Sequence, residues 1–99
     1  IAKSLAATSD WTLKSECLSA YCIGEEIAGN NRTGFSALPG GCRTNVGAFY
    51  GQGDYAYWWD ATENDAARAW GRWLYYDSAY LGRNYRFKEY GFSVRLVRD

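Results

Sequence analysis

The sequence predicts a single domain of the α+β class, built mainly from short antiparallel strands with little helix. The chain has 99 residues, enough for one modest hydrophobic core but not for two. Clusters of turn-forming residues recur roughly every 8–12 residues over most of its length. Between these turns apolar and polar residues alternate, which is the pattern of strands with one buried face.

The first third of the chain carries the weakest strand pattern. Residues 1–8 end a helix or form a short strand, and Ser9-Asp10 interrupts that pattern. Residues 11–32 are polar and contain two glycines, so we expect a long loop with one helical turn at residues 14–20. So long a loop is uncommon in a compact domain, which predicts that it is either functional or held by a disulfide.

The remaining chain predicts strands or extended segments separated by turns. They cover residues 34–38, 42–50, 55–62, 67–76, 83–90 and 92–97. The first ends at Pro39-Gly40-Gly41, and the second contains Gly47, which predicts a bulge or turn. The third is rich in aromatic residues, and the fifth is a solvated strand or an extended loop.

Residues 67–76 are ambiguous, because their alanines favour a helix. Their alternation and Gly71 favour a strand, which we predict. Residues 92–97 alternate most regularly, and we expect them to form an interior strand.

The composition excludes several classes of function. The chain has no histidine, which rules out Ser-His-Asp and Cys-His catalysis and histidine-ligated metals. Its formal net charge is zero, so we expect no nucleic-acid partner. It contains no apolar run long enough to span a membrane, and residues 1–8 do not have a signal-peptide pattern. We expect no cofactor and no metal.

The zero net charge hides an asymmetry. Residues 1–65 hold four basic and eight acidic side chains, whereas residues 66–99 hold seven basic and three acidic ones. Either the two parts pack together and neutralise each other, or the second part presents a basic, aromatic binding face.

The three cysteines allow three pairings, each of which leaves one thiol over. Cys17 and Cys22 are close enough in sequence for a local bridge, and Cys42 lies further along the chain. A disulfide would indicate an oxidising compartment, and three buried free thiols in a cytosolic protein are the alternative.

Four blocks carry a family resemblance: GFSALPGGCR at 34–43, YWWDATE at 57–63, AWGRWLYY at 69–76 and GFSVRLVRD at 91–99. In this order they resemble the Fibrobacter succinogenes major paralogous domain, which is common in secreted and lipid-anchored bacterial proteins. The chain departs from that family at Cys42, often an aromatic residue there, and at Leu96, often a cysteine.

The resemblance implies a C-type lectin-like fold, related to the branch of the formylglycine-generating enzymes. It also implies that this chain is the C-terminal portion of a domain, without the N-terminal strand and helices. Neither the catalytic cysteines of those enzymes nor the Trp-Asn-Asp triplet of calcium-dependent lectins has a counterpart here.

Residues 73–90 are the most informative stretch for function, because tyrosines and arginines alternate there with few aliphatic residues. Such side chains form adaptable binding surfaces. The predicted ligand-binding residues are Trp73, Tyr75, Asp77, Tyr80, Arg83, Tyr85 and Arg86. Alternatively, half of these tyrosines pack over a thin core.

Four further residues are predicted to be structural. Trp58 and Trp59 are adjacent, so in a strand they point to opposite faces. We expect Glu63 to be buried and to accept backbone hydrogen bonds at a turn, and Arg95 to pair with Glu63 or Asp60.

The acidic residues around Glu63 could bind calcium through their oxygens, but capping of turns is the simpler interpretation. No pair of carboxylates is marked out for glycoside hydrolysis, so no catalytic residue is predicted.

These observations predict a non-catalytic binding module of an extracellular or cell-surface bacterial protein, which recognises a carbohydrate or a protein surface. Three alternatives remain: a structural domain of a cell-surface lipoprotein without a ligand, a retroelement-diversified display protein, and a formylglycine-generating type of enzyme that has lost or relocated its residues. A half-domain exposes apolar surface, which predicts a homodimer.

Overall fold

The structure, a computed structural model, describes residues 1–15, 17 and 22–95. Its helical segments are α1 (Ala2–Leu5) and the 3-10 helix η1 (Ile27–Gly29). The strands are β1 (Cys42–Arg43), β2 (Phe49–Tyr50), β3 (Tyr55–Glu63), β4 (Arg68–Tyr75) and β5 (Gly82–Phe87). The prediction of mainly antiparallel strands with little helix is therefore confirmed.

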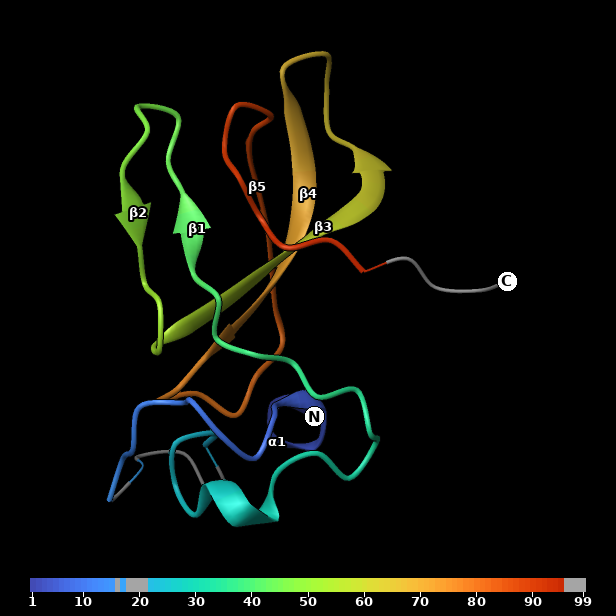
Figure 1. Cartoon of the computed structure of the whole chain (residues 1–99). Coiled ribbons are helices and arrows are strands. Elements are labelled where there is room, and N and C mark those ends of the chain that lie inside the picture. The colour runs from blue at the N-terminus through green and yellow to red at the C-terminus, as the bar shows by residue number, and fades with distance from the viewer. Residues whose placement is uncertain (16, 18–21, 96–99) are drawn as a thin grey trace.

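A three-stranded antiparallel sheet, in the order β3-β4-β5, forms the upper part of the molecule (Figure 1). β3 pairs with β4 from Tyr55 opposite Tyr75 to Trp59 opposite Gly71, and β4 pairs with β5 along most of its length. Residues that lie opposite each other in such a sheet project from the same face. The register therefore decides which aromatic side chains share a face.

The predicted strand at residues 67–76 is confirmed as β4. Gly71 and Trp73 are buried and Arg72 between them is exposed, as the alternation requires. A Cβ atom at Gly71 would lie 3.1 Å from both the carbonyl oxygen of Trp58 and Nε1 of Trp73. Glycine thus fits this position because its neighbours approach the backbone closely.

Strands β1 and β2 form a separate hairpin (Figure 1). Its turn is closed by a 2.7 Å hydrogen bond from the Thr44 N–H to the Ala48 carbonyl, and Gly47 adopts a φ of 87°. The predicted turn at Gly47 is therefore confirmed. Reciprocal backbone hydrogen bonds of 2.9 and 2.7 Å between Arg43 and Gly91 attach the hairpin to the segment that follows β5.

The hydrophobic core lies where β3 begins and β4 ends, against α1 and the loops around it (Figure 1). It consists of buried residues from distant parts of the chain: Ala2, Ala6, Trp11, Ile23, Ala37, Ala56 and Leu74. Nε1 of Trp11 donates a 3.1 Å hydrogen bond to the Ala37 carbonyl. The largest core side chain thus also satisfies its polar atom.

The long loop is held by several interactions rather than by regular structure. Cys17 and Cys22 form a disulfide, which selects one of the three pairings left open by the sequence. Asn30, only 6% exposed, donates hydrogen bonds to the carbonyls of Ala7 at 3.0 Å and Ile23 at 3.3 Å. The buried side chain of Asn30 therefore attaches the loop to the backbone of the core.

Two predicted strands are not formed as expected. In residues 34–38 only Ala37 is paired, in a parallel bridge with Ala6. The described part of the predicted interior strand at 92–97 makes one bridge, Ser93 with Trp58. Residues 96–97, like most of the predicted helical turn at 14–20, lie outside the described residues. Alternation was present in both segments, but the described residues of each pair with their neighbour at one position only, which is too few to form a ladder.

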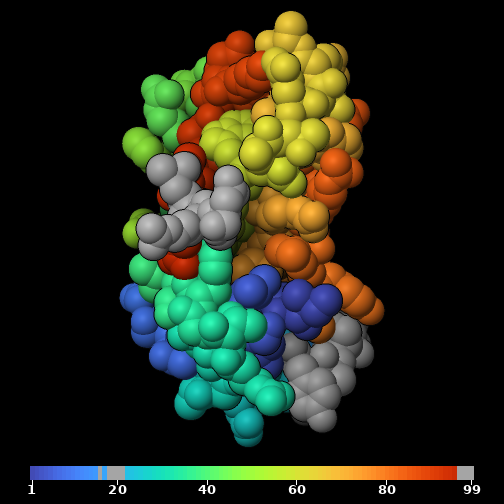
Figure 2. Space-filling model, turned by 90° about the vertical axis from the view of Figure 1, so that its right-hand side faces the viewer, coloured from blue at the N-terminus to red at the C-terminus, as the bar shows by residue number. Residues whose placement is uncertain are grey.

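The molecule is elongated, with extents of 40 × 33 × 21 Å. Figure 2 shows the strands and their hairpins above and the blue to cyan N-terminal segments below. Among the described residues, no helix has the length and apolar character needed to cross a membrane.

Replacing Trp11 with Phe tests the core. The change keeps an aromatic ring but removes the hydrogen bond to Ala37 and some packing volume, so the free energy of unfolding should fall by about 1–3 kcal/mol. Urea unfolding measures it. Leu13→Ala is the control, because Leu13 is 70% exposed and its loss should cost about 0.5 kcal/mol or less. Equal effects of the two changes would contradict the described core.

Candidate functional site

The aromatic residues of β3 and β4 gather on one face of the sheet, here called the cleft face. It is formed by alternate residues of three strands: Tyr55, Tyr57, Trp59, Trp73, Tyr75 and Arg86. The rings pack edge to face or stack, with Tyr55 and Tyr75 centred 4.7 Å apart and Tyr57 and Trp73 5.2 Å apart. Such contacts stabilise a face that has few aliphatic side chains.

The β1–β2 hairpin lies against this face, and a cleft of about 240 Å³ remains between them. Tyr50 of β2 stacks on Tyr55 at 5.7 Å, and Phe92 stacks on Tyr57 at 5.2 Å. The residues that line the cleft are Cys42, Thr44, Tyr50, Tyr57, Arg86, Tyr90 and Phe92. The cleft therefore presents aromatic rings, hydroxyl groups and a single charged side chain.

Arg86 supplies that charge. Its guanidinium carbon lies 4.5 Å from the centre of the Trp73 ring, and Nη1 donates a 2.9 Å hydrogen bond to the Tyr85 carbonyl. In the part of the chain that the structure describes, the salt bridges join Arg68 with Asp65, Arg72 with Asp60 and Lys88 with Glu63. None of them involves Arg86.

Burial or hydrogen bonding favours the neutral forms of four titratable groups on or beside the cleft. Burial raises the pKa of Tyr57 well above its usual value of 10.0. Burial likewise raises the pKa of Tyr75 and of the Cys42 thiol, and in both cases the charge of Arg86 acts in the opposite direction. A hydrogen bond with Tyr50, followed by burial, raises the pKa of Tyr55. At neutral pH the charge of Arg86 therefore dominates the cleft.

The opposite face of β4 and β5 carries an exposed row of arginine and aromatic side chains. This Arg–aromatic ladder consists of Arg68, Trp70, Arg83, Tyr85 and Phe87. The guanidinium of Arg83 lies 3.7 Å from the centre of the Trp70 ring, and Trp70 meets Tyr85 edge to face at 5.3 Å. These cation–π contacts order a surface that has no covering layer in the described residues.

The predicted ligand-binding residues are divided between these places. Trp73, Tyr75 and Arg86 belong to the cleft face, with Trp73 buried. Arg83 and Tyr85 belong to the ladder on the opposite face. The two remaining residues, Asp77 and Tyr80, lie in the turn between β4 and β5, where Tyr80 is 73% exposed. Alternation within each strand therefore prevents the seven residues from forming one surface.

The two adjacent tryptophans point to opposite faces, as predicted. Trp58 meets Phe35 edge to face at 5.7 Å, on the side of the core. Trp59 packs against Phe92 at 4.2 Å, on the cleft face. Both are half-buried.

The expected partners of Glu63 and Arg95 were wrong. Glu63 is exposed and pairs with Lys88 of the turn after β5. Arg95 donates a hydrogen bond to the Phe35 carbonyl and stacks over the Phe35 ring at 4.0 Å. The register shift in β3 before Glu63 carries this residue to the exposed end of the sheet, away from Arg95.

The remaining acidic residues near Glu63 cap turns. Asp60 accepts a 3.1 Å hydrogen bond from the Thr62 N–H and lies 3.7 Å from Arg72. Asp65 accepts from the N–H groups of Ala67 and Arg68 at 2.9 and 2.8 Å. These contacts account for their positions without a calcium ion.

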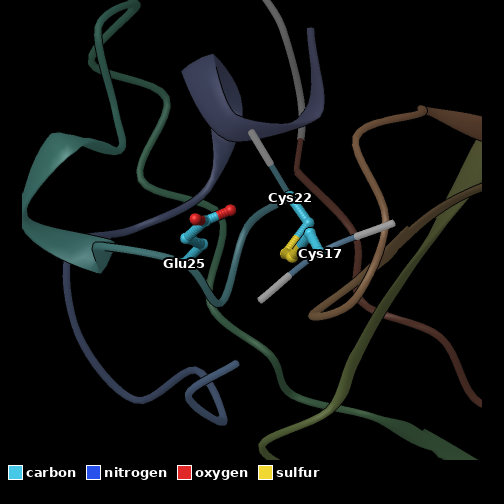
Figure 3. Close-up of side chains that lie close together, drawn as sticks. All are labelled: Cys17, Cys22 and Glu25. Carbon is cyan, nitrogen blue, oxygen red and sulfur yellow. A yellow bond between two sulfur atoms is a disulfide. The ribbon is translucent and has the colours of Figure 1, made fainter. Parts of the chain in front are cut away.

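One other cluster has the elements of a metal site. Glu25 lies beside Cys17 and Cys22, with the carboxylate and the two sulfurs within 4.8 Å of one another (Figure 3). The sulfurs are joined in the disulfide, so they are not thiolate ligands. The disulfide therefore accounts for the short distance between the two sulfurs, and no metal ion is needed to explain it.

Sequence reasoning missed Tyr50, Tyr90 and Cys42 as parts of the cleft. The sequence predicted a bulge or turn at Gly47, but no local pattern showed that residues 42–50 form a hairpin or which sheet face it covers. Tyr90 lay inside the stretch singled out for its tyrosines, although we did not select it.

The family model described as Fibrobacter succinogenes major domain matches residues 5–98. No curated protein and no solved structure matches the chain.

The buried tyrosines predict a loss of stability at alkaline pH. Because the folded-state pKa values of Tyr55, Tyr57 and Tyr75 are raised, the folded chain keeps protons that the unfolded chain loses above about pH 10. Their contribution to stability is therefore complete below that pH and is lost as pH rises further. Absorbance at 295 nm and circular dichroism should change together, and Tyr57→Phe should weaken the effect. Ionisation of all tyrosines near pH 10 with the fold intact would contradict this.

Cys42 should react slowly with iodoacetamide. Burial raises its thiol pKa from 9.0, and the thiolate is the reactive form. We expect alkylation of the folded protein at pH 7.5 to be about tenfold slower than alkylation in urea, measured by mass spectrometry. Equal rates in the two conditions would show that Cys42 is neither shielded nor shifted.

Proposed function

The chain belongs to the Fibrobacter succinogenes major domain family, and from this premise we propose that it is a non-catalytic module that binds a carbohydrate in the cleft between the hairpin and the sheet. The observation that carries the proposal is the cleft lining, in which tyrosine, phenylalanine and threonine side chains surround a half-buried arginine. Aromatic faces stack on the C–H faces of sugar rings, and hydroxyl and guanidinium groups bond sugar hydroxyls.

The size of the cleft supports a small ligand. Pockets for drug-sized molecules span roughly 300–1,000 Å³. The cleft measures about 240 Å³ and is open on one side. It is therefore suited to one sugar residue at a time, with the rest of the glycan extending into solvent.

The nature of the lining favours binding over hydrolysis. Glycoside hydrolysis generally needs two carboxylates that flank the bond to be broken. Among the described residues that line the cleft there is no aspartate or glutamate. The two acidic residues of β3, Asp60 and Glu63, are paired with Arg72 and Lys88.

We propose an extracellular or bacterial cell-surface location, supported by the disulfide between Cys17 and Cys22. Such bridges persist in oxidising compartments. A C-type lectin-like fold, which the family resemblance implies, agrees with the small antiparallel sheets and remains part of the proposal. The homodimer stays a prediction.

Replacing Tyr90 with Ala tests the proposed function. Tyr90 lines the cleft and is half-buried, so truncating its ring should remove a stacking surface and weaken glycan binding by about 1–2 kcal/mol. The ligand is first identified on a glycan array, and its affinity is then measured by calorimetry.

Tyr85→Ala is the matched control, because Tyr85 lies on the opposite face and is 40% exposed. The affinity of the Tyr85→Ala variant for the glycan should equal that of the wild-type protein. If Tyr85→Ala lost glycan binding and Tyr90→Ala kept it, the binding site would lie on the Arg–aromatic ladder and not in the cleft. Absence of binding to every glycan would contradict the proposed function.

A further inference from the structure

Arg86 is a cation without a counterion in the wall of the cleft. It is half-buried, and its Nη1 donates a hydrogen bond to the Tyr85 carbonyl. Within the described residues, its other guanidinium N–H groups have no hydrogen-bond partner. By contrast, the arginine of β4 at position 72 and the lysine at position 88 each have a carboxylate partner. Partly buried charges are usually paired, so the missing partner is informative.

The charge of Arg86 is felt on both sides of the cleft. It lowers the pKa of Cys42, on the hairpin, and of Tyr75, on β4, against the larger effect of burial. Asp77 acts on Tyr75 in the opposite sense, but more weakly than Arg86. An anion that enters the cleft therefore meets a positive potential there.

The stacking of Arg86 on Trp73 also orients it. The guanidinium carbon lies over the indole ring, 4.5 Å from its centre, which is a cation–π contact. A guanidinium held in this way loses less side-chain entropy when it binds an anion, and its planar fork matches a carboxylate. Arginine at this position thus favours an oxyanion over a neutral hydroxyl group.

We propose that the cleft selects an anionic saccharide, such as a chain of uronic acids, with Arg86 binding the negative group and the rings of Tyr50, Tyr90 and Phe92 covering the sugar. The inference rests on the proposed function, since it names the class of glycan for that same cleft. A carboxylate or a sulfate ester could supply the negative charge, and the shared chemistry is an oxyanion on a sugar ring.

The test compares oligogalacturonides with the same oligosaccharides after their carboxyl groups have been reduced to hydroxymethyl groups. Calorimetry at low and at physiological salt should show that the wild-type protein prefers the charged form by about tenfold or more. The preference should shrink as salt increases. A sulfated galactan of equal length identifies the preferred source of charge.

Arg86→Gln should abolish the preference for the charged form, so that the variant binds the charged and the reduced forms with about equal affinity. Arg86→Lys, which keeps a cation at this position, should retain part of the preference. This variant serves as a control for a general loss of folding. Arg83→Gln is the matched control, because Arg83 also belongs to β5 and stacks on a tryptophan, but on the opposite face. The Arg83→Gln variant should prefer the charged oligosaccharide as strongly as the wild-type protein does.

The outcomes separate the two proposals. Equal wild-type affinity for the charged and reduced forms would overturn the selection of anionic sugars and leave carbohydrate binding intact. Binding of neither form, nor of any other glycan, would overturn both. A glutamate-rich peptide that binds as tightly as the oligogalacturonide would overturn the assignment to a saccharide.

Discussion

The antiparallel pairing of β3 with β4 is the interaction on which the rest of the structure depends. β4 is the central strand of the sheet, and β3 receives bridges on its other edge from Gly41 and Ser93. Segments that precede and follow the sheet in the sequence therefore meet along β3. At Gly71 a Cβ atom would lie only 3.1–3.2 Å from Trp58, Trp73 and Phe92, so this position of the register favours glycine.

This pairing gives the sheet two faces with different roles. On one side Ala56 and Leu74 join the core with α1 and the long loop. On the other side Tyr55, Tyr57, Trp73 and Tyr75 form an aromatic layer that the hairpin covers in part. A small domain with few aliphatic residues thus obtains its second packed layer from rings.

The distribution of charge follows from the same geometry. The acidic residues of β3 and of the turn after it meet cations of β4 and of the turn after β5, so that Asp60, Glu63 and Asp65 are all paired. Arg86 lies on the cleft face of β5, and the residues that line the cleft beside it include no carboxylate. Within the described residues that line the cleft, Arg86 is the only charged side chain, and it therefore gives the cleft its sign.

The sequence by itself determined the strand-rich class, the turn at Gly47, the turn between the segments 42–50 and 55–62, the strands β3 and β4, and the opposite orientation of Trp58 and Trp59. Each of these depends on alternation or turn chemistry over a few residues, which is a local property. The family resemblance of four blocks was likewise visible in the chain. Only the tertiary structure decided which face of β5 borders a cleft, with Arg86 on that face and Arg83 on the other. It also decided that Arg95 stacks on Phe35, and that Cys42 and Tyr50 complete a cleft. These contacts join residues far apart in sequence, and their partners are chosen by register and by docking of the hairpin, which no local pattern encodes.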